Sequence, residues 1–238
     1  KHPVDIFEKY KKSVHGVALF EKGDLGVANC GKCHGSHGAM PPGVKEIGNT
    51  CGKCHVNEKK YFLQGPHAQA SQDGYFSECA SCHDYHDIQR PDTNLYNTAC
   101  LNCHSEGDEA FKRGQKIKEM IDSSHNALAA AEQTVKQAAM EGIFVDEEAA
   151  SLQEVKTNVI EMAPLQHSLS AAKIAELHDS AVSLTDGIKN GIQGKRRSLK
   201  WRKIALVPLW IFIFLMVVVL QMKYKELKGK KDERDPRA

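Results

Sequence analysis

Residues 30–55 read CGKCHGSHGAMPPGVKEIGNTCGKCH, and residues 79–104 read CASCHDYHDIQRPDTNLYNTACLNCH. Each stretch begins and ends with Cys-x-x-Cys-His, and in both of them the two motifs start 21 residues apart. The second stretch repeats the cysteine pattern of the first 49 residues later, so the chain contains an internal duplication. Together the four motifs use all eight cysteines of the 238-residue chain.

The Cys-x-x-Cys-His motif is the attachment signature of c-type haem. Its two thiols add to the vinyl groups of the macrocycle, and the histidine that follows is placed to bind the iron. One copy alone could be a redox dithiol or half of a zinc site, but four copies that leave no cysteine over favour haem. We therefore predict four covalently bound haem c groups. Their expected attachment residues are Cys30, Cys33, Cys51, Cys54, Cys79, Cys82, Cys100 and Cys103, and their proximal ligands are His34, His55, His83 and His104.

Each repeat, about 10–58 and 59–106, carries two further histidines. One precedes the first motif and the other lies three residues after the first proximal histidine. These four residues are predicted to be the distal ligands of bis-histidine haems, and they are His15, His37, His67 and His86. Three residues of chain cannot reach around a haem ring, so His37 should ligate a haem other than that of His34. The alternative for His37 and His86 is a loop histidine that bonds a propionate.

The remaining histidines and one methionine are weaker candidates. His2, near the haem domain, could displace one of the four predicted distal ligands. His125 lies in a helical stretch and is expected at the surface or between helices, and His167 and His178 are expected to be ordinary helix residues. Met40 could be an axial thioether, which would raise the potential of its haem, but we expect a loop methionine that covers a haem edge.

Residues 1–106, the predicted tetrahaem domain, offer few side chains for an ordinary core. Only 24 of them are Val, Ile, Leu, Met, Phe or Tyr, and none is Trp. Their Gly, Cys, His and Pro content predicts loops and short helices. We therefore expect the haems themselves to supply much of the buried surface. The net charge of +2 provides no basic footprint for nucleic acid.

Residues 107–194 have the composition of long helices. Hydrophobic periodicity predicts one helix over about 109–141 and a second that begins near 146. Pro164 should kink or break the second helix, after which the pattern resumes. We expect a helical hairpin that packs mainly against itself, the alternative being a docking face for another subunit.

Residues 204–222 contain no charge and one Gln, and as a helix they would span about 28 Å, close to the thickness of a hydrocarbon core. We predict a basic flank and transmembrane helix over 195–223. Because both flanks are basic, charge does not decide the orientation. Haem attachment does: it predicts the haem domain on the periplasmic side of a bacterial cytoplasmic membrane and residues 224–238 as a cytoplasmic tail. The predicted class is mainly α, with a haem-packed, loop-rich domain, a helical hairpin and one C-terminal transmembrane helix.

Three segments resemble a known family. Residues 10–16 (YKKSVHG), 33–38 (CHGSHG) and 82–86 (CHDYH) are similar to the multihaem c-type cytochromes of bacterial membrane electron-transfer chains, over roughly residues 5–106. The resemblance implies low-potential bis-histidine haems and electron exchange with membrane quinol oxidoreductases or terminal reductases. The chain departs from the quinol-oxidising type, whose anchor is N-terminal, and it lacks the lysine-ligated motif of the pentahaem nitrite reductases.

We expect the chain to relay electrons between a membrane quinol-linked complex of cytochrome b type and a periplasmic redox partner, as an electron-transfer subunit rather than a catalyst. If every iron has two protein ligands, no position remains for a substrate. The alternative is a multihaem reductase with one open haem that acts on a small oxyanion or peroxide. The apolar segment has no histidine for a b-type haem, so electrons should enter through the haem domain. We expect the hairpin and residues 195–203 to hold that domain near the membrane surface.

Overall fold

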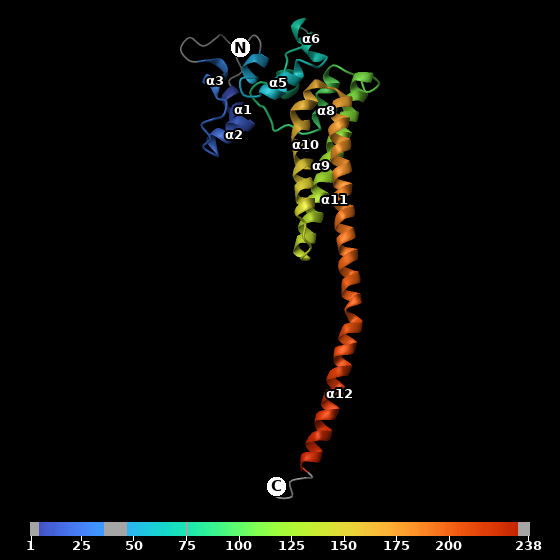
Figure 1. The fold of residues 1–238 in the computed structure, drawn as a ribbon. Coiled ribbons are helices and arrows are strands. Elements are labelled where there is room, and N and C mark those ends of the chain that lie inside the picture. Colours follow the sequence, from blue (N-terminus) through green and yellow to red (C-terminus); the bar gives the residue numbers. More distant parts are fainter. Residues whose placement is uncertain (1–4, 36–46, 75, 233–238) are drawn as a thin grey trace.

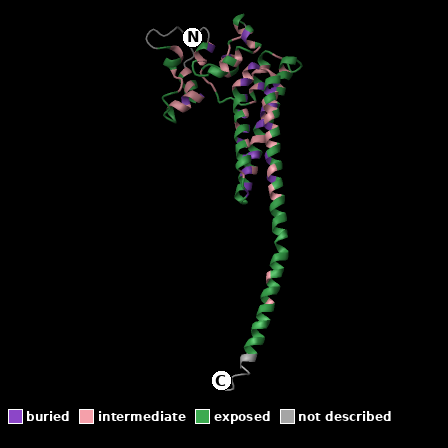
Figure 2. Ribbon diagram, in the orientation of Figure 1, coloured by how far each residue is buried: buried purple, intermediate pink, exposed green. Residues whose placement is uncertain are grey.

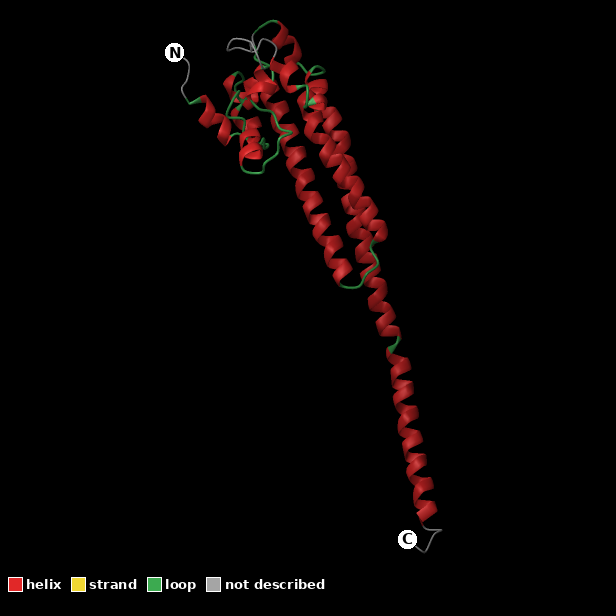
Figure 3. Ribbon diagram, turned by 90° about the vertical axis from the view of Figure 1, so that its left-hand side faces the viewer, coloured by secondary structure: helices red, strands yellow, loops and turns green. Residues whose placement is uncertain are grey.

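The computed structural model describes residues 5–35, 47–74 and 76–232, and within these ranges the chain is helical with no strand (Figures 1 and 3). The mainly α class is therefore confirmed. The N-terminal half contains short helices joined by loops. They are α1 (Ile6–Lys12), α2 (Val14–Phe20), α3 (Cys30–His34), α4 (Ile47–Cys51), α5 (Val56–Phe62), α6 (His67–Gln72), α7 (Ala80–His83), α8 (Leu95–Thr98) and the 3-10 turn η1 (Cys100–Asn102).

A bundle is formed by three long helices, α9 (Glu109–Met140), α10 (Asp146–Leu165) and α11 (Ala171–Ala205) (Figure 3). Each helix runs antiparallel to the one before it in the chain. The segment predicted as a hairpin therefore forms three helices. Pro164 lies in the last turn of α10, and its missing amide donor interrupts the helix one residue before its end. The chain then turns through η2 (Gln166–Ser168), and the Ser170 side chain caps the start of α11.

The buried apolar residues form two clusters in the bundle, visible as the buried stripe in Figure 2. One cluster lies toward the α9–α10 turn and is centred on Val135, Val155 and Ile188. The other contains Ile117, Met162 and Ile174 and lies toward the N-terminal half. Tyr96 of α8 is buried in this second cluster, so the N-terminal half contributes to the core of the bundle.

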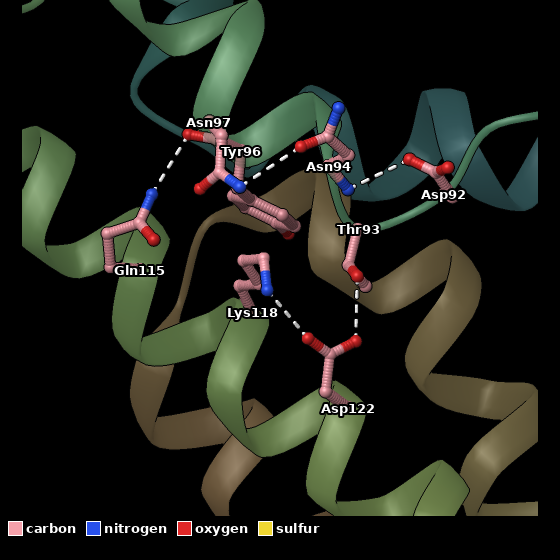
Figure 4. Close-up of polar contacts among 8 residues, drawn as sticks. All are labelled: Asp92, Thr93, Asn94, Tyr96, Asn97, Gln115, Lys118 and Asp122. Atoms are coloured by element: carbon pink, nitrogen blue, oxygen red, sulfur yellow. Dashed lines mark hydrogen bonds and ion pairs between the residues drawn. The ribbon is translucent and has the colours of Figure 1, made fainter.

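Polar contacts reinforce the junction between the N-terminal half and α9 (Figure 4). The Gln115 amide donates to the carbonyl of Tyr96 over 3.0 Å, and the Thr93 hydroxyl donates to Asp122 over 2.7 Å. Lys118 donates to the second oxygen of Asp122, also over 2.7 Å. Burial raises the pKa of Asp122, but the bonds from Lys118 and Thr93 outweigh burial and leave this pKa below its usual value.

Apolar burial is sparse in the described part of the N-terminal half. Its buried apolar residues are Ala68, Ala80 and Tyr96, whereas Leu25 and Val56 are exposed. The bundle, by contrast, buries side chains such as Ile117 and Val155 completely. Side chains of the N-terminal half therefore do not build a core of ordinary size.

The last helix, α12 (Val207–Asp232), continues the direction of α11 after a break at Leu206 (Figures 1 and 3). Pro208 explains the break, because it cannot donate to the carbonyl four residues earlier. The apolar side chains of α12 are exposed, and this is the one helix among the described residues that is long and apolar enough to cross a membrane.

The N-terminal half lies far from the apolar segment. It contacts the end of the bundle at which α11 begins, opposite to α12 (Figure 1). At 1.5 Å per residue, α11 separates that end from the apolar segment by about 50 Å. The continuous 35-residue helix is the physical reason, because a rigid rod cannot fold the two ends together.

Candidate cofactor site

The four motif histidines lie in the N-terminal half, and each has a second histidine ring close to it. None of these second rings comes from the same motif. The ring centroids are 6.0 Å apart for His34 and His86, 6.2 Å for His67 and His104, 6.2 Å for His83 and His167, and 6.3 Å for His15 and His55.

This separation fits one iron between two imidazoles. Imidazole nitrogens bind first-row metals at about 2.0–2.1 Å and lie about 1.1 Å from the ring centre, so two opposed ligands place their centroids about 6 Å apart. A haem iron takes four ligands from its macrocycle and one or two from the protein. Within residues 5–35, 47–74 and 76–232, no group of three or more His, Cys, Asp or Glu is arranged to hold a metal ion alone. The histidine pairs and the adjacent cysteines are the residue types that haem c would use.

The first and third motifs share a local design that places the histidine at a helix end. In α3, the Asn29 side chain accepts a hydrogen bond from the Lys32 amide and so starts the helix at Cys30. The residue after the histidine has a positive φ in both motifs, 84° at Gly35 and 66° at Asp84. With ψ at 173° and 179°, this backbone leaves the helix directly after the imidazole; glycine adopts it freely, whereas Asp84 is strained there.

The segments that carry His15 and His86 are bonded to each other. The Val14 amide donates to the carbonyl of Ile88 over 2.8 Å. Ser13 caps α2 through the Gly16 amide at 3.1 Å, and a Cβ at Gly16 would overlap the carbonyl of Tyr10. The tight α1–α2 turn therefore holds His15 in place. His86 lies beside His34 of the first motif rather than beside His83, its own neighbour in sequence.

Three of these histidines have a lowered pKa. At His15, burial is the largest cause of the lowered pKa, and repulsion from His55 is the second. At His67, burial lowers the pKa most, followed by repulsion from His104. At His83, burial is again first, and His167 and His55 add to it in lowering the pKa. A lowered pKa favours the neutral imidazole, which is the form that binds metal.

Neighbouring motifs contact one another in chain order. The pKa of the Cys33 thiol is raised by burial and then by Cys51, which links the first and second motifs. A hydrogen bond with Cys79 lowers the pKa of Cys51 to about 7 and links the second and third. Burial followed by Cys100 raises the pKa of Cys82, which links the third and fourth. Cysteines of successive motifs therefore lie close to one another.

The other candidate residues have different outcomes. His2, His37 and Met40 lie outside the described residues. His125 is exposed on α9, and His178 of α11 lies 2.9 Å from the buried Ser124 hydroxyl, as ordinary helix residues do. His167, expected to be an ordinary helix residue, instead lies in the η2 turn and faces His83.

Comparison of the chain with protein-family models, with curated proteins and with solved structures found no match in any of the three.

Proposed function

We propose that this chain is a membrane-anchored tetrahaem c-type cytochrome that carries electrons. The observation that supports this most is the pairing of all four motif histidines with a second ring at the separation that one iron requires. With both axial positions taken by protein, no position is open to a substrate, which favours an electron carrier over the reductase alternative. When bound, haem supplies a one-electron redox centre.

In this proposal the chain attaches, orients and surrounds its cofactors. The eight motif cysteines form the thioether bonds, and His34, His55, His83 and His104 are the proximal ligands. His15, His67 and His86 are distal ligands, held by the α1–α2 turn, by α6 and by the segment bonded to α2. The exposed apolar side chains of the N-terminal half gain cover from the macrocycles, which supplies the core that the side chains lack. The closeness of successive motifs supports a relay of electrons within the domain.

The exposed apolar helix supports a single membrane crossing by α12. Because c-type haem is attached outside the bacterial cytoplasmic membrane, the haem half lies on the periplasmic side and the C-terminal tail in the cytoplasm. The proposed partners are an integral quinol-reacting or cytochrome b-type subunit and a periplasmic redox partner. The 35-residue α11 implies that the membrane partner presents its redox centre about 50 Å from the bilayer.

Intact mass and ligand binding test the proposal on protein purified with its cofactors from a host that matures c-type cytochromes. We expect a mass increase of four haems on one chain, and no change in the spectrum of the reduced protein when carbon monoxide is added. Carbon monoxide binding to one haem would favour the reductase alternative. A chain that carries no covalent haem would contradict the proposal itself.

A further inference from the structure

The turn between α10 and α11 has a backbone that its own side chains hold in one shape. Ser168 is buried, and its hydroxyl donates to the Leu165 carbonyl over 2.8 Å and accepts from the Ser170 amide over 3.3 Å. Leu169 has a φ of 50°, a left-handed conformation that is uncommon for a residue with a large side chain. Such a conformation persists only where its surroundings enforce it, and it often marks a functional position.

The same turn is docked against the N-terminal half. The Tyr96 hydroxyl donates to the Gln166 side chain over 3.1 Å, and Lys173 donates to the Gln64 side chain over 3.0 Å. At Gly65 the backbone is so close that a Cβ would lie 3.0 Å from the carbonyl oxygens of His167 and Ser168. These contacts place the turn beside the link between α5 and α6, within reach of the motifs.

The His167 ring is oriented by a backbone carbonyl. Its Nδ1 lies 3.0 Å from the Pro164 oxygen, and because a carbonyl can only accept, Nδ1 carries the hydrogen. That carbonyl lies in the last turn of α10, where the Gln166 backbone amide also donates to it. The Nε2 atom then keeps its lone pair. Metal-ligating histidines usually donate their other ring nitrogen in this way, which fixes both tautomer and orientation.

We propose that His167 is the distal axial ligand of the haem attached at Cys79 and Cys82, opposite His83. The two rings are 6.2 Å apart, as in the other three pairs, and their planes are inclined by 31°. The inference rests on the proposed function, and it replaces the expectation that His37 completes the set of distal ligands. The third haem then binds residues of both halves, so it joins the N-terminal half to the helical bundle.

The test is His167→Ala in the full-length, haem-loaded protein, read by electron paramagnetic resonance and optical spectra of the ferric state. We expect four covalent haems, one of which becomes high-spin, and we expect added imidazole to return that haem to the low-spin state. His178→Ala is the matched control, because it removes a histidine of the same bundle that is hydrogen-bonded to Ser124, and all four haems should stay low-spin. His37→Ala, tested in parallel, should also leave all four low-spin.

Low-spin haems throughout in His167→Ala, with a high-spin haem in His37→Ala, would overturn the inference and leave the proposed function intact. Absence of covalent haem from the unmodified chain would instead refute the proposed function. If His167→Ala is not recovered folded, His167→Met keeps a sixth ligand at the same position. A thioether ligand raises the reduction potential of its haem, so one of the four midpoint potentials should rise. Four unchanged midpoint potentials would also overturn the inference.

Discussion

Gly65 lies where the link between α5 and α6 touches the turn that carries His167. A Cβ added there would be 3.0 Å from two carbonyl oxygens, closer than atoms normally approach, and the turn is held from several sides. We predict that Gly65→Ala lowers the free energy of unfolding by about 1–3 kcal/mol, the usual cost of overpacking. Denaturant titration of the haem-loaded protein, followed by circular dichroism, measures this.

Gly187→Ala is the matched control, because Gly187 is an exposed residue inside α11 with open space around its Cα. Alanine at this position should raise the free energy of unfolding by about 0.5–1 kcal/mol, because its helix propensity is higher than that of glycine. Equal effects of the two substitutions would mean that the turn does not press on Gly65.

At the residue scale, the duplication shows what the sequence could and could not predict. His15 and His67 occupy equivalent places in the two repeats, so the pattern predicts them twice. His167 stands outside the repeats, and its neighbours have ordinary helical periodicity. One signal was available: Pro164 marks a helix end, and an antiparallel return from α9 brings that end back toward the motifs. Nothing in the local sequence says which loop it meets, because that depends on tertiary packing.

Among the helices, the start of α10 is joined to α11 by a buried charge. The side chain of Glu148 is almost wholly buried, and Lys195 donates to it over 2.7 Å. Lys195→Met would leave a buried carboxylate without its cation, which is more costly than losing both charges. We predict a lower denaturation midpoint for Lys195→Met, largely restored in the double variant Lys195→Met with Glu148→Gln. A double variant that is worse than the single one would contradict this account.

The same pair has a predictable pH dependence. The hydrogen bond with Glu148 raises the pKa of Lys195 above its ordinary value of 10.5. A cation whose pKa is raised by folding contributes its full stabilisation of the fold below its ordinary pKa. This contribution is lost as the pH rises through the pKa of the group in the folded protein. As the pH is raised from neutral, the stability difference between wild type and Lys195→Met should therefore begin to shrink above pH 10.5. A difference that vanishes near neutral pH would indicate another cause.

The helical elements were predicted from the sequence more fully than their arrangement. Periodicity and the acidic residues from Asp146 onward predict the starts and lengths of α9 and α10 within a few residues. The hairpin prediction missed that the third periodic stretch is an equal member of the bundle. It missed too that α11 runs toward the apolar segment with only a one-residue break. Pro208 marks that break, and the glycines at 187, 191 and 194 lie inside α11, where packing outweighs their low helix propensity.

At the scale of the whole molecule, the N-terminal half and the apolar helix lie at opposite ends of the long helix α11. A chain that ends at residue 203 removes α12, whose apolar side chains are exposed, and leaves the buried clusters of the bundle whole. We predict that this shorter chain stays soluble without detergent and keeps all four haems, whereas the full chain requires detergent. Membrane fractionation together with haem content checks this. A truncated chain that remains in the membrane fraction would show a second means of attachment.

The central claim is that four histidine pairs each hold one iron, and the spin state of the intact ferric protein tests it most directly. Electron paramagnetic resonance should show only low-spin haem, with integrated intensity equal to four haems per chain once magnetic coupling between neighbours is included. Bis-imidazole ligation at every site requires that result. A high-spin signal that accounts for one or more haems in the undamaged full-length protein would contradict the account.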